Sequence, residues 1–261
     1  MDSDYIYYCV VDFEATCWEN LTPKEQITKP WEIIEFPSVL FKLNENTNEL
    51  EYLSEIQKYC RPVVNPQLSQ FCTDLTGIEQ KTVDTADIFP TILREHYLWI
   101  INQVGENNLD KTILLSCGRW DFETALYKEL KRWIGNSIFM KNEPALYNFM
   151  LSIPSIYKRF INVKDLYEDI FHDKNSMVGM LGKLNIILEG RHHSGLDDSK
   201  NIGKILQKVY NKNTYKKYIN LLQWNLKENI PNNDKNPTQN TTQNTTHRPK
   251  HFNKHSKKTQ N

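Results

Sequence analysis

The sequence predicts an α/β domain with a mixed central sheet flanked by helices, and two observations lead to that prediction. The first segment, Tyr5 to Asp12, is a continuous apolar and β-branched run, which is typical of a buried strand. Further strand-like segments follow, and after Ile88 segments with helical spacing alternate with short strands. Strands followed by alternating strands and helices are typical of α/β architectures.

Two antiparallel strands are predicted after the first one. Glu32 to Leu43 and Leu50 to Arg61 alternate loosely between apolar and polar residues on either side of the polar turn Asn44 to Asn48. Pro37 lies inside the first of these two strands. Because proline cannot donate a hydrogen bond to a β-ladder, it predicts a bulge or an edge position there.

The remaining elements are predicted from apolar spacing. A helix begins near Ile88, with Pro90 in its first turn. The segment Gly135 to Ser155 has no regular pattern, and we expect it to be irregular. The other expected elements are strands at Thr112 to Ser116 and Ile161 to Val163, and helices at Trp120 to Ile134, Lys164 to Phe171, Ser176 to Leu184, Ser194 or Gly195 to Tyr210, and Tyr215 to Trp224.

The composition divides the chain into a globular part and a tail. With 39% hydrophobic residues, the 261-residue chain can bury one sizeable core, which we assign to residues 1–230. Residues 231–261 are rich in Asn, Thr, Gln, Lys and His, so we expect a disordered tail. The tail holds six lysines and arginines against one aspartate, a net charge of +5 that leaves −5 for the rest of the neutral chain. A net-acidic body suits a polyanionic partner only where bound cations neutralise its carboxylates.

The sequence gives no sign of a membrane protein or of a disulfide framework. No run approaches the roughly 18 apolar residues that span a bilayer, and the N-terminus lacks the basic region of a secretory signal. The five cysteines are odd in number and show no C-x-x-C spacing, which argues against disulfides and a structural zinc site. We therefore expect an intracellular protein, cytoplasmic or nuclear, with no membrane partner.

Acidic residues follow two of the predicted strands. Asp12 and Glu14 are separated by one residue at the end of the first strand, so both side chains project from one face. Asp121 lies where the strand Thr112 to Ser116 turns through Gly118 into a helix. Either feature alone is weak, because D-x-E pairs arise by chance and an isolated acid at a helix start is more often an N-cap.

A histidine and a fourth acid complete the set. His193 precedes Asp198 by five positions at the start of the long helix. Two-metal phosphodiester hydrolysis needs such residues, since carboxylates hold the cations and an imidazole with a pKa near 6.5 can accept the proton of the attacking water. Mg²⁺ suits a site of this kind because it prefers oxygen ligands.

Four ordered motifs resemble one enzyme family. They are VVDFEATC at 10–17, FCTDLTGI at 71–78, CGRWD at 117–121 and GRHHSGLDDSKNI at 190–202. Together they resemble the DEDDh exonucleases of the DnaQ/RNase T superfamily, specifically the enhanced-RNAi and histone-mRNA 3′ exoribonuclease branch. The resemblance extends from about Tyr5 to Tyr210 and implies a ribonuclease-H-like exonuclease fold.

The resemblance also implies a role for individual residues. Two Mg²⁺ ions, for which Mn²⁺ can substitute, would be held by four acids, and His193 would activate water, with Glu14 beside it in the catalytic centre. His192 and Asp197 are set aside by motif spacing alone. The four metal-binding acids are Asp12, Glu14, Asp121 and Asp198. The expected substrate contacts are Ala15 and Thr16 near the terminal ribose, and Trp120, Leu75 and Thr76 near the last base.

The expected function is that of a 3′-to-5′ exoribonuclease. It would release nucleoside 5′-monophosphates from RNA with a free 3′ end, in RNA processing or small-RNA turnover. A DNA 3′ exonuclease is the alternative, because the same metal centre hydrolyses either backbone. A catalytically silent RNA-binding protein is disfavoured because all four acids and the histidine are present. The sequence points to no particular protein partner.

Overall fold

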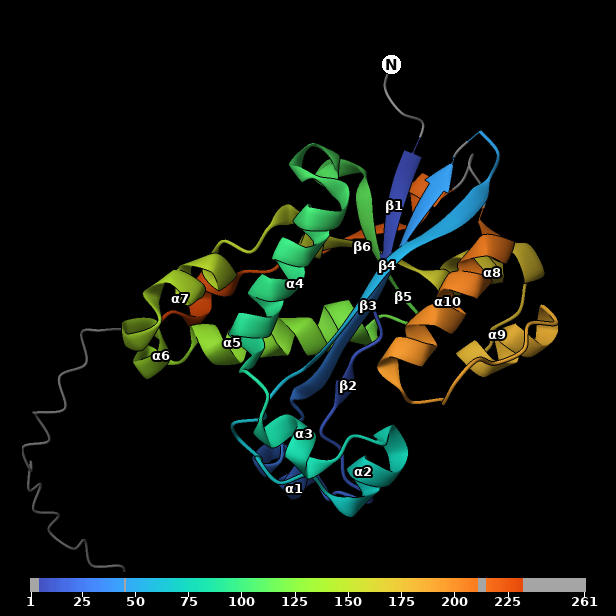
Figure 1. Cartoon of the computed structure of the whole chain (residues 1–261). Coiled ribbons are helices and arrows are strands. Elements are labelled where there is room, and N and C mark those ends of the chain that lie inside the picture. The colour runs from blue at the N-terminus through green and yellow to red at the C-terminus, as the bar shows by residue number, and fades with distance from the viewer. Residues whose placement is uncertain (1–4, 45, 211–214, 232–261) are drawn as a thin grey trace, which may run out of the picture. The chain divides into compact units, whose positions relative to one another are not determined.

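A seven-stranded mixed sheet forms the centre of the structure (Figure 1). The computed structural model describes residues 5–44, 46–210 and 215–231. The strand order is β2-β3-β1-β5-β6-β7, and β4 pairs with β3. The strands are β1 (Tyr5–Val10), β2 (Glu14–Ala15), β3 (Ile33–Asn44), β4 (Glu49–Tyr59), β5 (Thr112–Ser116), β6 (Arg159–Asn162) and β7 (Ile219–Leu221).

β1 lies in the middle of the sheet and sets the position of the site. It pairs antiparallel with β3 and parallel with β5, and β5 pairs parallel with β6. The apolar runs of β1 and β5 are buried because helices cover both faces of these strands. The carboxyl ends of β1 and β5 lie at the same edge of the sheet, where the acidic motifs follow.

Helices lie on both faces of the sheet (Figure 1). In that view α4 to α7 lie on one side and α8 to α10 on the other. The helices are α1 (Pro23–Thr28), α2 (Gln70–Thr76), α3 (Gln80–Asp84), α4 (Phe89–Val104), α5 (Tyr127–Ile134), α6 (Ser137–Asn142), α7 (Pro144–Leu151), α8 (Val163–Phe171), α9 (Met177–Lys183) and α10 (Gly195–Val209). A π-helical segment, Trp120–Leu126, precedes α5.

Alternating residues of β1 contribute to two hydrophobic cores. Cys9 packs with residues of α4, α5 and α7, whereas Tyr8 and Val10 pack with residues of α8, α9 and α10. This is the two-residue period of a strand buried on both faces. The expected α/β class, with a mixed central sheet and flanking helices, is confirmed.

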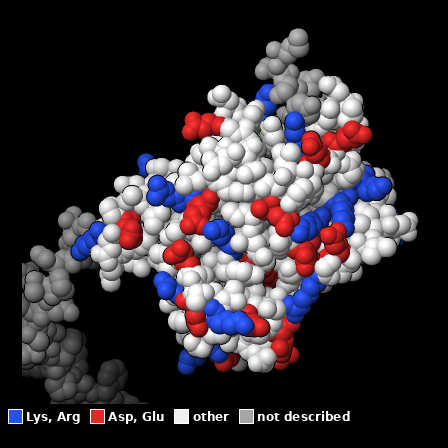
Figure 2. All heavy atoms as spheres, viewed as in Figure 1, with Lys and Arg blue, Asp and Glu red and all other residues white. Residues whose placement is uncertain are grey.

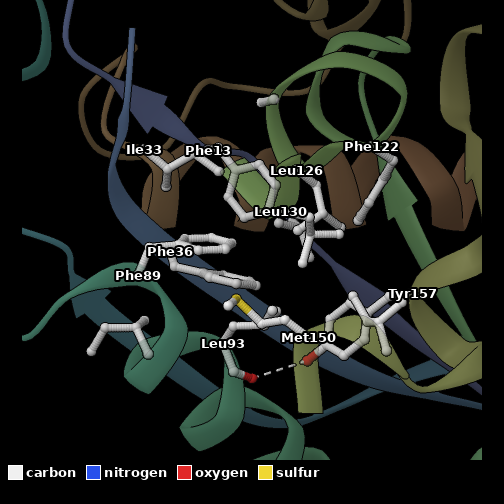
Figure 3. Packing of buried hydrophobic residues seen from close by; sticks show 14 of the residues in the cluster. Phe13, Ile33, Phe36, Phe89, Leu93, Phe122, Leu126, Leu130, Met150 and Tyr157 are labelled. Carbon is white, nitrogen blue, oxygen red and sulfur yellow. Dashed lines mark hydrogen bonds between the residues drawn. The ribbon is translucent and has the colours of Figure 1, made fainter. Parts of the chain in front are cut away.

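The first core holds the segment that carries the acids. Phe13 packs edge-on against Phe36 with ring centres 4.6 Å apart, and Phe122 lies 6.1 Å from Phe13 (Figure 3). Deeper in this core, the Tyr157 hydroxyl contacts the Leu93 carbonyl at 3.5 Å. The residue between Asp12 and Glu14 is therefore an anchor in the core, and the two acids lie on either side of it.

The bulge expected at Pro37 lies elsewhere in β3, and the expected edge position holds only locally. β3 is an internal strand, and its register with β4 shifts between Leu40 and Phe41 rather than at Pro37. On its other side β3 pairs with β2 at Glu35 and with β1 from Val39 onward. Pro37 is tolerated because it lies between these two pairings, where a backbone N–H is not needed on that side.

Two further expectations are corrected. Tyr215 to Trp224 is not one helix, because only Tyr215–Tyr218 are helical, as a short 3-10 turn, and residues 219–221 form β7 and pair with β6, with Ile219 opposite Ile161. Gly135 to Ser155 is not irregular, since it contains α6 and α7. Asn136 caps α6 by accepting hydrogen bonds from two backbone N–H groups, and Pro144 begins α7.

Residues 232–261, nearly all of the expected tail, lie outside the described part of the chain. In the described ranges, every helix is too short or too polar to cross a membrane.

Replacing Leu126 by alanine should destabilise the fold by about 2–5 kcal/mol, because truncating this fully buried leucine at the end of the π-helical segment leaves a cavity in the first core. Urea unfolding monitored by circular dichroism measures this change. Ile187→Ala is the matched control, since Ile187 is 87% exposed and its truncation should change stability by less than about 0.5 kcal/mol. Equal effects of the two variants would contradict the proposed packing.

Candidate active site

Three carboxylates from separate elements meet at the end of β1. Asp12 follows β1, Glu14 begins β2, and Asp198 lies in the first turn of α10. One oxygen from each can be chosen so that all three lie within 4.8 Å of one another. Asp198 is only 2% exposed. The structure thus brings together three of the four acids that the sequence indicates as metal ligands.

The fourth acid, Asp121, adjoins this group without being part of it. It lies in the first turn of the π-helical segment, and its Oδ1 accepts a hydrogen bond from the Phe13 N–H at 2.9 Å. Its charge raises the pKa of the neighbouring Asp12 carboxyl, after the larger effect of burial. A π-turn is a common local distortion at functional sites. Here it places Asp121 beside the backbone between Asp12 and Glu14.

The electrostatics of the site favour a bound cation. Burial and the charges of nearby acids, Glu35 first among them, raise the pKa of Glu14 to about 9. Burial also raises the pKa of Asp121 to about 6 and shifts those of Asp12 and Asp198 upward. These shifts show that the protein alone does not neutralise the four acids. Buried carboxylate oxygens held close together are a donor set that fits a hard divalent cation.

Two stacked histidines border the carboxylates. The rings of His192 and His193 are 3.9 Å apart between centres. Nδ1 of His192 lies 3.1 Å from Oδ2 of Asp198, and the same oxygen accepts the backbone N–H of His193 at 2.8 Å. Burial, followed by the adjacent His192, lowers the pKa of the His193 imidazole. Its neutral form, which can accept a proton, therefore predominates at neutral pH.

Asp197, the other acid of the third motif, stabilises the loop before α10. The Asp197 carboxylate accepts the backbone N–H of Arg191 at 2.9 Å and so closes the loop that carries the histidines. His192, by contrast, is the histidine whose ring touches Asp198. Asp198, and not Asp197, lies in the carboxylate group with Asp12 and Glu14, and both histidines lie beside Asp198.

Glu35 is a residue of the site that the sequence reasoning misses. It lies on β3 directly opposite Glu14 in the β2–β3 pair and is 1% exposed. Its Oε2 accepts the N–H of Gly195 at 3.2 Å, and its Oε1 accepts from the Gln57 side chain at 2.8 Å. Glu35 therefore joins the strand that supports Glu14 to the first residue of α10. The sequence signal that could have indicated Glu35 is its acidic side chain within the otherwise apolar run of β3.

α10 contacts β1 closely because it begins with glycine. A β-carbon at Gly195 would lie 2.4 Å from the Asp12 carbonyl oxygen, far inside van der Waals contact. This close approach brings Asp198 to Asp12, since Asp198 is one helical turn further on. The glycine in the third motif thus has a steric explanation.

The residues expected near the ribose lie next to the acids. Thr16 is buried, and its backbone pairs with Glu32, whose N–H also donates to the Thr16 Oγ1 at 2.9 Å. The Ala15 carbonyl accepts a weak bond from the Cys72 thiol at 3.7 Å. Trp120 is 39% exposed and contacts Trp31, with ring centres 5.3 Å apart. Ala15 directly follows Glu14, Thr16 is the next residue, and Trp120 directly precedes Asp121.

Arg191 links the end of α2, where Leu75 and Thr76 lie, to the loop that carries the two histidines. Arg191 donates to the Asp74 carbonyl and lies over Gly77 at the end of α2. Leu75 is partly exposed there, whereas Thr76 is buried and its hydroxyl donates to the Cys72 carbonyl at 2.8 Å. Leu75 is therefore the better placed of the two for contact with a base.

Carboxylates gathered at the strand ends of an α/β sheet are typical of a metal-dependent nuclease. Comparison with known proteins points to the same class. A family model described as Exonuclease, the RNase T family, matches residues 9–206. The chain belongs to this exonuclease family. Membership implies divalent metal ions, and the carboxylate group at Asp12, Glu14 and Asp198 suits them.

Several proteins are similar in sequence or structure. The rat protein named 3′-5′ exoribonuclease 1 is 40% identical over 209 residues, which cover 78% of this chain and 53% of the rat protein. The Drosophila melanogaster 3′-5′ exonuclease Snipper is 36% identical, with 78% and 69% covered. The chain thus spans about half the length of the first of these relatives.

One solved structure is similar over its whole length. It is the nuclease domain of 3′hExo, a DEDDh family member, bound to rAMP. Its TM-score is 0.63 at 36% identity, and the match covers 85% of this chain and all of that domain. A second structure describes recognition of a histone mRNA stem-loop by a 3′-exonuclease, with a TM-score of 0.61, 34% identity and coverages of 84% and 87%. The expected ribonuclease-H-like exonuclease fold is confirmed.

Replacing Gly195 by alanine should push α10 away from β1 and separate Asp198 from Asp12. We expect a loss of about 1–3 kcal/mol in unfolding free energy together with weaker Mn²⁺ binding. Urea unfolding and calorimetric titration measure the two effects. Gly182→Ala in α9 is the control, because its β-carbon meets no atom within 4 Å and should stabilise the helix by about 0.5–1 kcal/mol. Wild-type stability and Mn²⁺ binding of Gly195→Ala would show that the close approach is not required.

Proposed function

We propose that this chain is a metal-dependent 3′-to-5′ exoribonuclease that releases nucleoside 5′-monophosphates from RNA with a free 3′ end. The observation that carries the proposal is the convergence of Asp12, Glu14 and Asp198 beside two histidines. The names of its relatives and the rAMP bound to a similar nuclease domain support this choice of reaction and substrate. Such an enzyme would act in RNA processing or small-RNA turnover.

The four acids of the proposal are the metal ligands, and the metals are two Mg²⁺ ions, with Mn²⁺ able to replace them. Asp12, Glu14 and Asp198 form the shared donor group, and Asp121 extends it from the side of Asp12. When bound, two such cations stabilise the charges on the attacking and leaving oxygens of a phosphodiester. The raised pKa values of the acids support this role, because the site needs positive charge to keep all four ionised.

His193 is the proposed general base. Its lowered pKa keeps the imidazole neutral at neutral pH, so it can accept the proton that the attacking water loses. Its backbone N–H is bonded to Asp198, which holds the residue at the edge of the carboxylate group. His192 contacts the same carboxylate through its ring and would orient Asp198. Glu14 lies within the donor group and would hold the substrate phosphate beside His193 through the shared cation.

The terminal nucleotide would lie between the two motifs that flank the acids. Ala15 and Thr16 would border its ribose, while Trp120 and Leu75 would contact its base. Trp120 is exposed enough for stacking, which is tolerant of base identity. The buried Thr76 would support Leu75 from below rather than touch the base through its hydroxyl.

DNA hydrolysis is the second candidate, because the relative from Drosophila is named an exonuclease without restriction to RNA. A silent RNA-binding protein is a weaker candidate, since each proposed ligand and base is present. The two experiments below separate these functions.

Metal binding should stabilise the wild-type protein and not Asp12→Asn. At a metal concentration of about 100 times Kd, binding adds ~2.7 kcal/mol, which corresponds to a rise of roughly 5–10 °C in Tm for a domain of this size. Without metal, Asp12→Asn should melt above the wild type, because it removes one of the mutually repelling carboxylates. Differential scanning calorimetry with and without Mn²⁺ tests both. Asp110→Asn, at an exposed position, should keep the metal response.

His193→Ala should lower kcat on RNA by about 10²- to 10⁴-fold, the usual contribution of a general base. His192→Ala should cause a smaller loss, which makes it the matched control from the same ring pair. Hydrolysis of 5′-labelled RNA and DNA of one sequence, followed by product length, measures both variants. Shortening of RNA from its 3′ end supports the proposal, and preferential shortening of DNA favours the second candidate. A larger loss of kcat in His192→Ala than in His193→Ala would make His192 the general base instead. If the wild type hydrolyses neither RNA nor DNA, a catalytically silent RNA-binding protein is favoured.

A further inference from the structure

A groove next to the proposed catalytic centre has no role in the function described so far. Its walls include Thr16, Trp18, Lys29, Trp31 and Lys128, and it encloses about 420 Å³. That volume falls in the usual range of about 300–1,000 Å³ for ligand sites. The combination of two tryptophans and two lysines makes the groove chemically distinct from an ordinary surface depression.

The groove is continuous with the proposed site on two sides. Thr16 belongs to both, two residues after Glu14. On the other side, the ring of Trp31 contacts that of Trp120, which directly precedes Asp121. The groove therefore starts where the terminal nucleotide is proposed to sit and extends away from the carboxylates.

Both lysines face the groove over an aromatic ring. The Lys29 ammonium is 5.9 Å from the centre of the Trp18 ring, and that of Lys128 is 4.1 Å from the Trp31 ring. Neither ammonium forms an ion pair with any residue in the described ranges. Their charges are thus available to an anionic ligand, which can compete with the weak attraction to a ring face.

Polar contacts fix the backbone of the segments that line the groove. Arg132 donates to the Trp31 carbonyl at 2.8 Å and also binds the buried Glu129. In α1, Thr22 and Glu25 form a capping box at the start of the helix. The N–H of Lys29 ends this helix by bonding to the Glu25 carbonyl at 2.7 Å. Lys29 and Lys128 therefore belong to two separate helical segments, the end of α1 and α5.

We infer that this groove binds the single-stranded nucleotides that precede the 3′-terminal nucleotide of the substrate. The inference rests on the proposed function and names the path of its substrate. Phosphates would bind Lys29 and Lys128, and a base would stack on Trp18. Cations interleaved with aromatic faces are the general means of binding single strands without sequence preference. Figure 2 shows that lysines, arginines and acidic residues are interspersed over the face in view.

The first test compares a long substrate with a minimal one. Lys29→Gln/Lys128→Gln and Trp18→Ala should each lower the ratio of kcat/KM for a nonauridylate to kcat/KM for the p-nitrophenyl ester of uridine 5′-monophosphate. We expect a fall of about tenfold, because only the long substrate reaches the groove. Lys81→Gln/Lys174→Gln is the matched control, since it removes the same charge from lysines that are more than 80% exposed. Its ratio should stay within about twofold of wild type, because rim charges contribute little.

The second test measures binding without hydrolysis. Fluorescence anisotropy of a 5′-labelled nonauridylate in EDTA gives the affinity as a function of salt. Loss of two phosphate contacts should make the slope of log K against log salt shallower by about 1.4 in Lys29→Gln/Lys128→Gln, and the control should keep the wild-type slope. Thermal unfolding of each variant checks that the fold is retained.

The outcomes separate this inference from the proposed function. Hydrolysis of both substrates by the wild type, with an unchanged ratio and salt slope in the groove variants, overturns the groove and leaves the exonuclease intact. If the wild type hydrolyses neither substrate, the proposed function fails and the salt slope alone decides the groove. If the salt slope of Lys29→Gln/Lys128→Gln is then as steep as that of the control, the groove inference is overturned. A shallower slope supports the groove as a single-strand binding surface.

Discussion

The contact between Gly195 and the Asp12 carbonyl is the constraint on which the rest of the site depends. α10 can lie against the end of β1 only because its first residue has no side chain. Asp198 is one turn along that helix, and the two histidines lie on the loop before it. Glu35 holds the same N-terminus from the neighbouring strand. A wider separation would leave the acids after β1 as an ordinary polar strand end.

This geometry brings several carboxylates together at a place where burial makes their ionised forms unfavourable. The acids lie at the edge of a sheet whose two faces are covered by apolar clusters, so burial and mutual repulsion act in the same direction. Phe13 anchors the acidic segment in the first core, and its N–H also neutralises part of the charge on Asp121. Hydrophobic packing therefore keeps the acids close until a divalent cation offsets their repulsion.

How much of this could be predicted depends on whether a feature is local in sequence. Asp12 and Glu14 lie two positions apart after a strand, so alternation alone indicates a shared face. Glu35 becomes part of the site only through the pairing of β2 with β3, and β7 forms only because β6 offers it an edge. The groove is likewise built from segments remote in sequence, with Lys29 ending one helix and Lys128 lying on another. Spacing along one segment does not encode such pairings.

The backbone conformation of His193 affects how substitutions at the site change the stability of the fold. Its φ of +67° is a left-handed conformation that glycine adopts freely and histidine does not. A glycine there would relax the loop, just as a neutral residue in place of an acid would relieve repulsion nearby. Substitutions that remove the proposed base or one of the proposed metal ligands are therefore expected to stabilise this fold rather than weaken it.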